Sequence, residues 1–239
     1  MKSFNRLRQL NNVVCKTIDD FGMKDVVVAD IATDHGYLAE LLSRNEKISK
    51  VIATDISEKC LNKTRELVER CELQKIETKL GDGLIPIDSV DLCVLAGIGG
   101  YEIIRILKTQ NYNVLGGNKC DIFVLQPSKN AEDLRCFLID VNIKIISDFV
   151  VFSGGKFYPI IVINLFEKND TEKSIFNIYF GRDNKLENAD FIRFLEEQIK
   201  EYLFLEKIDK LDIENSNDLK TKYEIFKLAK ELLNKSKGE

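Results

Sequence analysis

An apolar run that stops at a carboxylate indicates the fold class of this chain. Residues Val26 to Ala29 are uniformly apolar, begin with three consecutive valines, and are followed by Asp30. Such a run is typical of a parallel strand that is buried on both faces. The segment from Gly36 to Leu42 then has helical spacing. The residues in between form a strand-to-helix turn, and in α/β folds ligands bind at such turns.

The composition of this turn favours one class of ligand. A loop that binds a dinucleotide pyrophosphate needs three glycines, whereas this turn has one, Gly36, together with Asp30 and Asp34. The two carboxylates would repel a pyrophosphate but suit a ligand with ammonium, sulfonium and hydroxyl groups, such as S-adenosyl-L-methionine. The turn therefore predicts a methyl-donor site. The alternative is a plain joint between strand and helix with solvated aspartates.

A second strand ends in a carboxylate in the same way. Lys50–Asp55 is a short apolar run that, with the first strand and the helix between them, predicts a right-handed βαβ unit. Asp55 is the candidate acceptor for the two ribose hydroxyls of a bound nucleoside. Alternatively, it is the N-cap of the helix predicted over Glu58–Cys71.

Two further strands end in small or acidic residues. Ile76–Leu80 leads into Gly81-Asp82-Gly83-Leu84, where the glycines let the backbone approach a flat ring. Asp82 can accept a hydrogen bond from the exocyclic amine of adenine, although a surface turn also explains the motif. Val90–Leu95 runs into Ala96-Gly97-Ile98-Gly99-Gly100, whose small residues leave room for a flat acceptor beside the methyl group.

The remaining apolar runs complete a sheet. Asp121–Pro127 predicts a fifth strand with Gln126 at its mouth, and Ile143–Phe152 and Lys156–Phe166 predict two strands joined by a hairpin turn. Together the runs predict an α/β fold, a Rossmann-like class I methyltransferase with a seven-stranded, mostly parallel sheet. This domain is expected to cover residues 1–168 and to bind the donor.

Two details concern the helices of this domain. The helix predicted over Phe4–Phe21 should cover the sheet edge with its apolar side. Its Arg6 and Arg8 are interpreted as solvated charges rather than as phosphate contacts. Asn130 and Asp133 resemble a capping pair at the start of a later helix.

The chain changes character after Lys168, and residues 169–239 are expected to form an appendage. From Leu186 onward, apolar residues recur every three or four positions among dense charges. This spacing predicts two amphipathic helices packed as an antiparallel, coiled-coil-like hairpin, joined around Glu214–Asn217. The first helix is acidic and the second is basic, a contrast that either pairs the two helices or leaves a basic face for RNA.

Composition limits the other function classes. The formal net charge of −4 gives no global attraction to a polyanion, so any contact with nucleic acid must be a local patch. No signal peptide is recognisable, and no apolar run approaches the ~20 residues needed to span a bilayer. We therefore expect a cytoplasmic protein without membrane segments. The six cysteines are widely spaced, and several lie in apolar or helical runs, which favours buried, reduced thiols over disulfides or zinc ligands.

Four segments, taken in order, resemble the bacterial tRNA (adenine(22)-N1)-methyltransferase family, the TrmK-like enzymes. They are Ala29–Leu38, Gly81–Leu84, Leu95–Gly100 and Leu125–Pro127. The Asp34-His35 pair and the Ala96–Gly100 segment are the more specific, and the similarity extends to the helical tail. The chain departs from the family pattern at Asp82, at Ser128, and at Ser153 and Gly154 near the hairpin turn.

The resemblance implies transfer of the sulfonium methyl to N1 of an adenine in tRNA. Because N1 already has a lone pair, no general base is required, and alignment of the reactants can supply an effective molarity of roughly 10⁵ M or more. Positive charge moves onto the base, so Asp34 is the candidate for stabilising it, with His35 orienting Asp34 or lining the pocket. For His35, the alternative is a helix-start residue bonded to backbone. N1 lies on the Watson–Crick edge, so the adenine must first leave any base pair, and the tail helices are a candidate platform for the tRNA.

The candidate site residues therefore fall into three groups. The catalytic candidates are Asp34 and His35, and no metal ligand is predicted. The candidates for binding the donor are Asp30, Ala32, Thr33, Gly36, Asp55, Ile56, Asp82, Gly83, Ala96 and Gly97. The candidates for binding the substrate are Ile98, Gly99, Gly100, Gln126 and Tyr158.

Two other functions stay open at this point. One is a small-molecule methyltransferase whose tail serves only for dimerisation, and the other is a non-catalytic RNA-binding protein with a methyltransferase-like fold. The identity of the methylated acceptor tests the first, and donor binding tests the second. The sequence leaves the oligomeric state open, with a monomer favoured.

Overall fold

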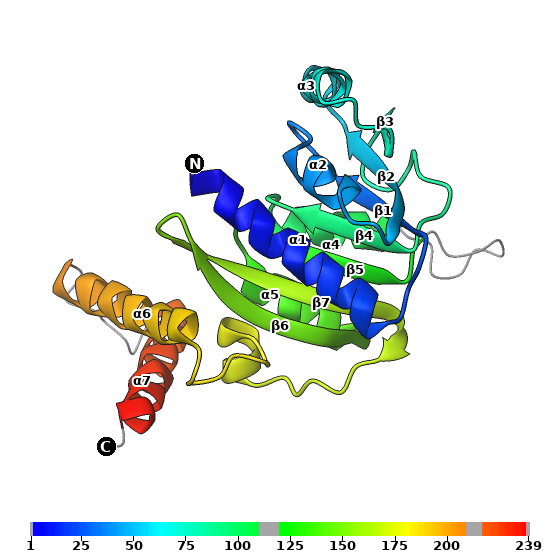
Figure 1. The fold of residues 1–239 in the computed structure, drawn as a ribbon. Helices are drawn as coiled ribbons and strands as arrows, with labels where there is room; N and C mark the ends of the chain where they lie inside the picture. The colour runs from blue at the N-terminus through cyan, green and yellow to red at the C-terminus, as the bar shows by residue number, and fades with distance from the viewer. Residues whose placement is uncertain (1, 110–119, 209–216, 238–239) are drawn as a thin grey trace.

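The computed structural model is an α/β fold in which one seven-stranded sheet lies between layers of helices (Figure 1). The strands are β1 (Val26–Ile31), β2 (Ile48–Asp55), β3 (Ile76–Leu80), β4 (Leu92–Ala96), β5 (Ile122–Gln126), β6 (Ile143–Ser153) and β7 (Lys156–Lys168). Their order in the sheet is β3-β2-β1-β4-β5-β7-β6. Strands β1 to β5 pair in parallel, while β7 is antiparallel to β5 and β6. The predicted fold class is confirmed.

The structure describes residues 2–109, 120–208 and 217–237. Within these ranges, no helix has the length and apolar character that crossing a membrane requires. All six cysteines are free thiols, as predicted, but only Cys93 and Cys120 are buried as expected, and Cys71 is exposed.

Helices cover both faces of the sheet. Helices α1 (Lys2–Asp20) and α2 (Tyr37–Ser43) pack on one face, and α4 (Gly100–Thr109) and α5 (Ala131–Asp140) pack on the other. Helix α3 (Glu58–Arg70) contacts β2 and β3. Within β1, Val28 belongs to the core on the α1 side and Ala29 to the core on the α4 side. Successive side chains of a strand point to opposite faces, so a strand between two helix layers must be apolar throughout.

The prediction that α1 covers the sheet edge is incomplete, because α1 contacts the edge strand β6 but also packs on the strands inside the sheet. Its apolar residues Leu10, Val14 and Ile18 are fully buried in the core that also contains residues of β1, β2, β4, β5 and β7. Figure 1 shows α1 lying across the face of the sheet. Because the apolar side runs along most of a 19-residue helix, burying it requires the width of the face.

The predicted capping pair at α5 is also wrong. Asn130 has a left-handed backbone with φ 58°, and its side chain makes no hydrogen bond to the start of the helix. Instead, its Nδ2 donates to Asp133 Oδ2 at 3.4 Å. Asparagine tolerates positive φ better than most residues, and here the turn brings the Asn130 carbonyl against Gly100 of α4.

The C-terminal residues form the predicted helical pair. A short helix η1 (Phe176–Phe180) precedes α6 (Ala189–Ile208) and α7 (Asn217–Lys237). Between α6 and α7, the Tyr202 and Phe226 rings stack with centroids 4.4 Å apart. The predicted connection around Glu214–Asn217 lies outside the described residues except for Asn217.

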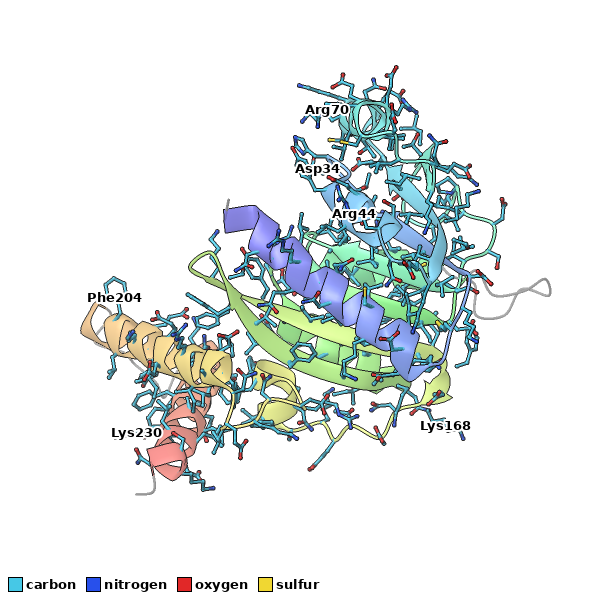
Figure 2. All side chains as sticks on the ribbon, in the orientation of Figure 1. Asp34, Arg44, Arg70, Lys168, Phe204 and Lys230 are labelled. Atoms are coloured by element: carbon cyan, nitrogen blue, oxygen red, sulfur yellow. The ribbon has the colours of Figure 1, made fainter. Side chains whose placement is uncertain are left out.

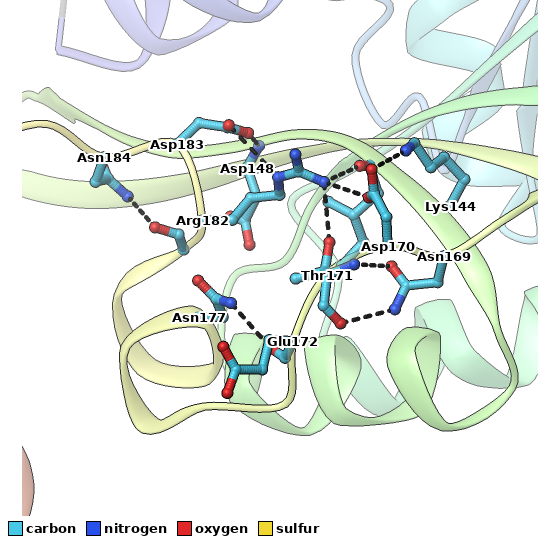
Figure 3. A network of polar contacts seen from close by, with 12 residues as sticks. Lys144, Asp148, Asn169, Asp170, Thr171, Glu172, Asn177, Arg182, Asp183 and Asn184 are labelled. Atoms are coloured by element: carbon cyan, nitrogen blue, oxygen red, sulfur yellow. Dashed lines mark hydrogen bonds and ion pairs between the residues drawn. The ribbon is translucent and has the colours of Figure 1, made fainter.

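Polar contacts tie the segment before α6 to the sheet (Figure 3). Arg182 Nη1 donates to the Ile145 carbonyl at 2.8 Å and to Asp170 Oδ1 at 2.9 Å. Asp183 Oδ2 accepts a hydrogen bond from the Asp148 N–H at 2.8 Å. Deeper in, the buried Arg135 guanidinium pairs with the Asp148 carboxylate at 2.6 Å. The first part of the tail is therefore hydrogen-bonded to β6.

Candidate active site

A cavity of about 360 Å³ opens at the carboxyl ends of β1, β2 and β4. This is the end of the sheet at which the sequence places the ligand site. Figure 2 shows Asp34 at this end, far from Lys168 at the end of β7. The residues lining the cavity come from the start of α1 and from the three strand ends: Arg6, Leu7, Asp30, Ala32, Thr33, Asp34, His35, Tyr37, Leu38, Asp55, Ala96, Gly97 and Ile98.

The turn after β1 has a constrained backbone. Ala32, Asp34 and Gly36 have φ angles of 59°, 53° and 73°, and positive φ is costly for residues other than glycine. A Cβ atom added at Gly36 would lie 2.6 Å from Thr64 Cγ2 of α3. The same threonine donates a hydrogen bond from Oγ1 to the Asp34 carbonyl at 3.1 Å. Gly36 therefore lets α3 pack against the turn and hold its shape.

Asp30 is a buried carboxylate at the end of β1. It accepts a hydrogen bond from Thr33 Oγ1 at 2.7 Å, and the Ala39 N–H of α2 also donates to it. Burial raises the pKa of Asp30 to about 6, although these hydrogen bonds oppose the rise. Removing a carboxylate from water disfavours its charged form, so a cationic ligand in the cavity would favour ionised Asp30.

Asp55 joins the turns that follow β1 and β2. Its Oδ2 accepts from the Asp34 N–H at 3.1 Å and its Oδ1 accepts from the Ser57 N–H at 2.9 Å. The N-cap of α3 is Ser57, whose Oγ accepts from the Cys60 N–H at 3.3 Å. The N-cap alternative for Asp55 is therefore wrong. A carboxylate has about four acceptor positions, so two remain for a ligand.

Asp34 and His35 form a hydrogen-bonded pair at the rim of the cavity. The Asp34 Oδ2 atom lies 2.6 Å from His35 Nδ1, and Lys63 Nζ lies 3.1 Å from His35 Nε2. Because an ammonium can only donate, these contacts assign the proton of a neutral imidazole to Nδ1, which donates to Asp34. The Tyr37 ring stacks on His35 with centroids 5.7 Å apart. The alternative that His35 bonds only to backbone does not hold.

The loops after β4 and β5 are tied to each other. The Ser128 N–H donates to the Ile98 carbonyl at 2.8 Å, and the Gly97 N–H donates to the Gln126 carbonyl at 3.0 Å. A Cβ atom at Gly100 would overlap the Asn130 carbonyl, so this glycine allows close contact between the loops. Ala96, Gly97 and Ile98 line the cavity with small or apolar residues.

The sequence interpretation missed Leu7, Tyr37 and Leu38, which line the cavity, and above all the charged Arg6. Its Nη1 donates to Gln126 Oε1, and its Cζ lies 5.6 Å from the centroid of the Tyr158 ring. The sequence pattern predicts a solvated charge at Arg6, whereas the side chain lines the cavity. A signal was present, because Arg6 is one helical turn before the buried Leu10 and so shares the apolar side of α1.

Several predicted site residues lie outside the cavity lining. Asp82 pairs with Arg105 through two hydrogen bonds, at 2.9 and 2.5 Å, which hold the pKa of Asp82 below its usual range. Ile56 is 72% exposed, next to Asp55. Gln126 and Tyr158 lie behind Arg6. The predicted roles of all these residues, and of Gly36, Gly83, Gly99 and Gly100, stay predictions.

The chemistry of the cavity fits the predicted methyl donor. Asp30 and Asp34 supply negative charge for ammonium and sulfonium groups, Asp55 offers acceptors for a ribose, and Arg6 supplies one cation. The described residues contain no group of three or more His, Cys, Asp or Glu side chains that could hold a metal ion.

Comparisons with known proteins agree with this geometry. A family described as a methyltransferase domain matches residues 11–161. The tRNA (adenine(22)-N(1))-methyltransferase of Bacillus subtilis is 29% identical over 150 residues, which cover 62% of this chain and 62% of that protein. The alignment thus spans less than two thirds of that relative.

Solved structures extend the likeness to the tail. The M. capricolum TrmK in complex with S-adenosyl-homocysteine has a TM-score of 0.75 and 26% identity, covering 95% of this chain and 96% of that one. The B. subtilis TrmK has a TM-score of 0.70 and 24% identity, covering 91% and 96%, and at that identity it supports the fold alone.

Proposed function

Because the chain belongs to the methyltransferase-domain family, we propose that it transfers the methyl group of S-adenosyl-L-methionine to N1 of an adenine in tRNA, at position 22. The observation that carries the proposal is the extent of the likeness to the M. capricolum TrmK, which includes the helical tail as well as the sheet. That protein binds S-adenosyl-homocysteine, the demethylated form of the donor. The donor-binding chemistry of the cavity supports the same reaction.

The reaction needs little from the protein beyond alignment and charge. Adenine N1 supplies the electron pair for the new N–C bond, the electrons of the broken S–C bond pass to sulfur, and positive charge moves from sulfur to the base. Holding the two reactants in line converts a bimolecular step into a unimolecular one. Asp55 would hold the ribose with its two free acceptor positions, because its other two are fixed by the Asp34 and Ser57 N–H groups.

The carboxylates at the end of β1 and in the turn after it would stabilise the positive charges of the donor and the methylated base. Asp30 lies at the cavity wall and favours the cationic end of the donor. Asp34 receives a hydrogen bond from His35, which fixes its carboxylate at the rim. A negative group held there stabilises positive charge that develops on the adenine. The acceptor would enter beside Gly97 and Ile98, a glycine and an apolar residue of the cavity lining.

A methylation assay tests the proposal directly. The full chain is incubated with methyl-labelled donor and with two unmodified tRNA transcripts, which have adenine or guanine at position 22. We expect 1-methyladenosine in digests of the first transcript and no label in the second. Label in both transcripts would overturn the position, and donor binding without methylation of any tRNA would favour the small-molecule alternative. Failure to bind the donor would favour the non-catalytic alternative.

A further inference from the structure

One group of the proposed donor, its carboxylate, needs a positively charged partner that the acidic residues of the cavity cannot supply. S-adenosyl-L-methionine has a sulfonium, an ammonium and an α-carboxylate. The acidic residues of the cavity are Asp30, Asp34 and Asp55, which suit the two cations and the ribose but repel the carboxylate. Of the described residues that line the cavity, Arg6 alone has a permanent positive charge.

The surroundings of Arg6 hold its guanidinium in place. Gln126 is 1% exposed, and its Nε2 donates to the Pro127 carbonyl at 3.0 Å. This contact turns Gln126 Oε1 toward Arg6 Nη1, which donates to it. The Tyr158 ring supports the guanidinium at 5.6 Å. A guanidinium has five N–H donors in a rigid fork that matches a carboxylate, so donors remain after the bond to Gln126.

Gly97 gives the guanidinium access to the ligand. A Cβ atom added at Gly97 would lie 3.6 Å from Arg6 Nη1 and 3.9 Å from Nη2. Gly97 follows β4, the strand that neighbours β1 in the sheet. Arg6 is therefore placed between the donor side of the cavity, near Asp30, and the acceptor side, near Gln126.

The direction of charge transfer decides between these two sides. Methylation at N1 moves positive charge onto the acceptor base, and a guanidinium beside that base would oppose the transfer. A guanidinium bound to the donor carboxylate is instead neutralised by it. Building on the proposed function, we infer that Arg6 binds the α-carboxylate of the methionine part of the donor and that Gln126 positions Arg6.

Ligands that differ only in this carboxylate test the inference. S-adenosyl-L-methionine and its decarboxylated form share the adenosine, the sulfonium and the ammonium. Their affinities are measured by calorimetry for the wild type and for Arg6→Gln, Arg6→Lys and Arg8→Gln. We expect Arg6→Gln to weaken S-adenosyl-L-methionine binding by about 10- to 100-fold, in keeping with the loss of a charge-assisted hydrogen bond. Binding of the decarboxylated form should be unchanged or stronger.

The other variants make the readout specific. Arg6→Lys should retain part of the preference for the carboxylate, and Arg8→Gln, an exposed change two residues along α1, should leave both affinities alone. Asp55→Ala should weaken both ligands equally, because both contain the ribose. This variant separates the donor site as a whole from the role of Arg6.

Three results would overturn the inference. Equal loss of both ligands in Arg6→Gln would mean that Arg6 only supports the fold of the cavity. Unchanged donor affinity with weakened tRNA binding would place Arg6 on a phosphate of the acceptor instead. If the wild type binds neither ligand, the proposed function fails together with the inference, whereas donor binding that ignores Arg6 refutes the inference alone.

Discussion

Asp34 is the residue whose charge can be tested against the chemical step. Asp34→Asn keeps the size and removes the charge, so its effect should be larger in the transition state than in the ground state. We expect the single-turnover rate with saturating donor and tRNA to fall by roughly 10- to 100-fold. The side chain of Asp34 is 61% exposed, and solvent screening argues against a larger effect.

Donor affinity is the control for Asp34. It should fall much less than the rate in Asp34→Asn, because Asp30 and Asp55 still hold the donor. A loss of donor affinity in proportion to the rate would show that Asp34 holds the ammonium of the donor. An unchanged rate would leave Asp34 as part of the turn without a role in the chemistry.

Asp30 predicts a pH dependence of donor binding. With a pKa of about 6, Asp30 is mostly protonated at pH 5, and a cationic donor must then bind a site that has lost this charge. Donor affinity should therefore fall about tenfold between pH 7 and pH 5, as expected for one group with this pKa. Asp30→Asn should remove the dependence, and calorimetry at the two pH values measures it. A parallel pH profile in the variant would contradict the assignment.

The free protein should respond to pH in the opposite direction. The pKa of Asp30 is raised above 3.8, so between about pH 4 and pH 6 the folded state binds a proton that the unfolded state does not. The contribution of Asp30 to the free energy of unfolding falls as pH rises through this window. Comparing Asp30→Asn with the wild type by urea unfolding cancels the other titrating groups. A donor affinity that rises with pH, together with a free energy of unfolding that falls with pH, would identify Asp30 as the titrating group.

At the scale of elements, Gly36 decides whether α2, α3 and the turn can pack together. Gly36→Ala places a Cβ atom 2.6 Å from Thr64 Cγ2 at a φ of 73°. Gly22→Ala is the matched control, because its φ is 61° and an added Cβ would have no atom within 4 Å. Alanine at positive φ should lower the free energy of unfolding by roughly 1 kcal/mol in both variants. The clash with Thr64 should lower it by a further ~1–3 kcal/mol in Gly36→Ala.

Urea unfolding of the two glycine variants gives the comparison. If the free energy of unfolding falls equally in both, Thr64 yields without cost and the packing argument is wrong. Because Gly36 also shapes the turn that carries Asp34, Gly36→Ala should weaken donor binding as well, whereas Gly22→Ala should not.

Elements and strand-end carboxylates were predictable from sequence for a physical reason. A strand covered by helices on both faces must be an apolar run, so β1, β4 and β5 are recognisable without any tertiary information. Because parallel strands place their carboxyl ends together, Asp30 and Asp55 were also predictable as neighbours.

Pairings between distant segments were not predictable. Arg6 contacts Gln126, which is 120 residues away in the chain, and no local pattern encodes that contact. Arg105 of α4 reaches Asp82 across 23 residues, and no local pattern predicts this ion pair. Asn130 has positive φ and its carbonyl lies against Gly100, and local capping preference gives no sign of this contact.

At the scale of the whole molecule, the tail is both a packing element and an extension of the surface. Phe180, Phe191 and Leu195 share a core cluster with Val150 of β6. Deleting the chain from Leu186 onward would therefore expose apolar surface of β6 and η1 as well as remove α6 and α7. Such a deletion cannot separate RNA binding from folding, so surface charge is the better variable.

The groove between the tail and the sheet is not a basic channel. A cavity of about 510 Å³ lies between the segment after β5 and the tail helices, and its lining contains Glu132, Asp133 and Glu201 as well as Lys129 and Lys222. This mixture gives no net attraction to phosphate. Helix α7 carries exposed lysines, of which Lys227 and Lys235 pair with Glu224 and Glu231 of the same helix. Figure 2 shows Lys230 on this helix, away from Asp34 across the sheet.

Changing these lysines tests whether α7 contacts tRNA. Lys220, Lys227, Lys230 and Lys235 are exposed, and replacing all four with glutamine leaves the buried Ala229 and Leu233 in place. Each lysine that neutralises a phosphate releases counterions, so the slope of log affinity against log salt should become shallower by about 0.7–0.9 per contact. We expect weaker tRNA binding with this smaller slope, and an unchanged donor affinity.

The matched control changes the same number of lysines at the end of the sheet opposite the cavity. Lys16, Lys24, Lys47 and Lys50 are exposed there, around the amino ends of β1 and β2. Glutamine at these positions alters the net charge equally but should leave the tRNA affinity and its salt slope nearly unchanged, because a local patch, not net charge, attracts the RNA. If both sets of substitutions weaken tRNA binding to the same extent, the effect is one of overall charge. If neither does, α7 acts through its packing on α6 and η1, and the tRNA must be held by the surface around the cavity itself.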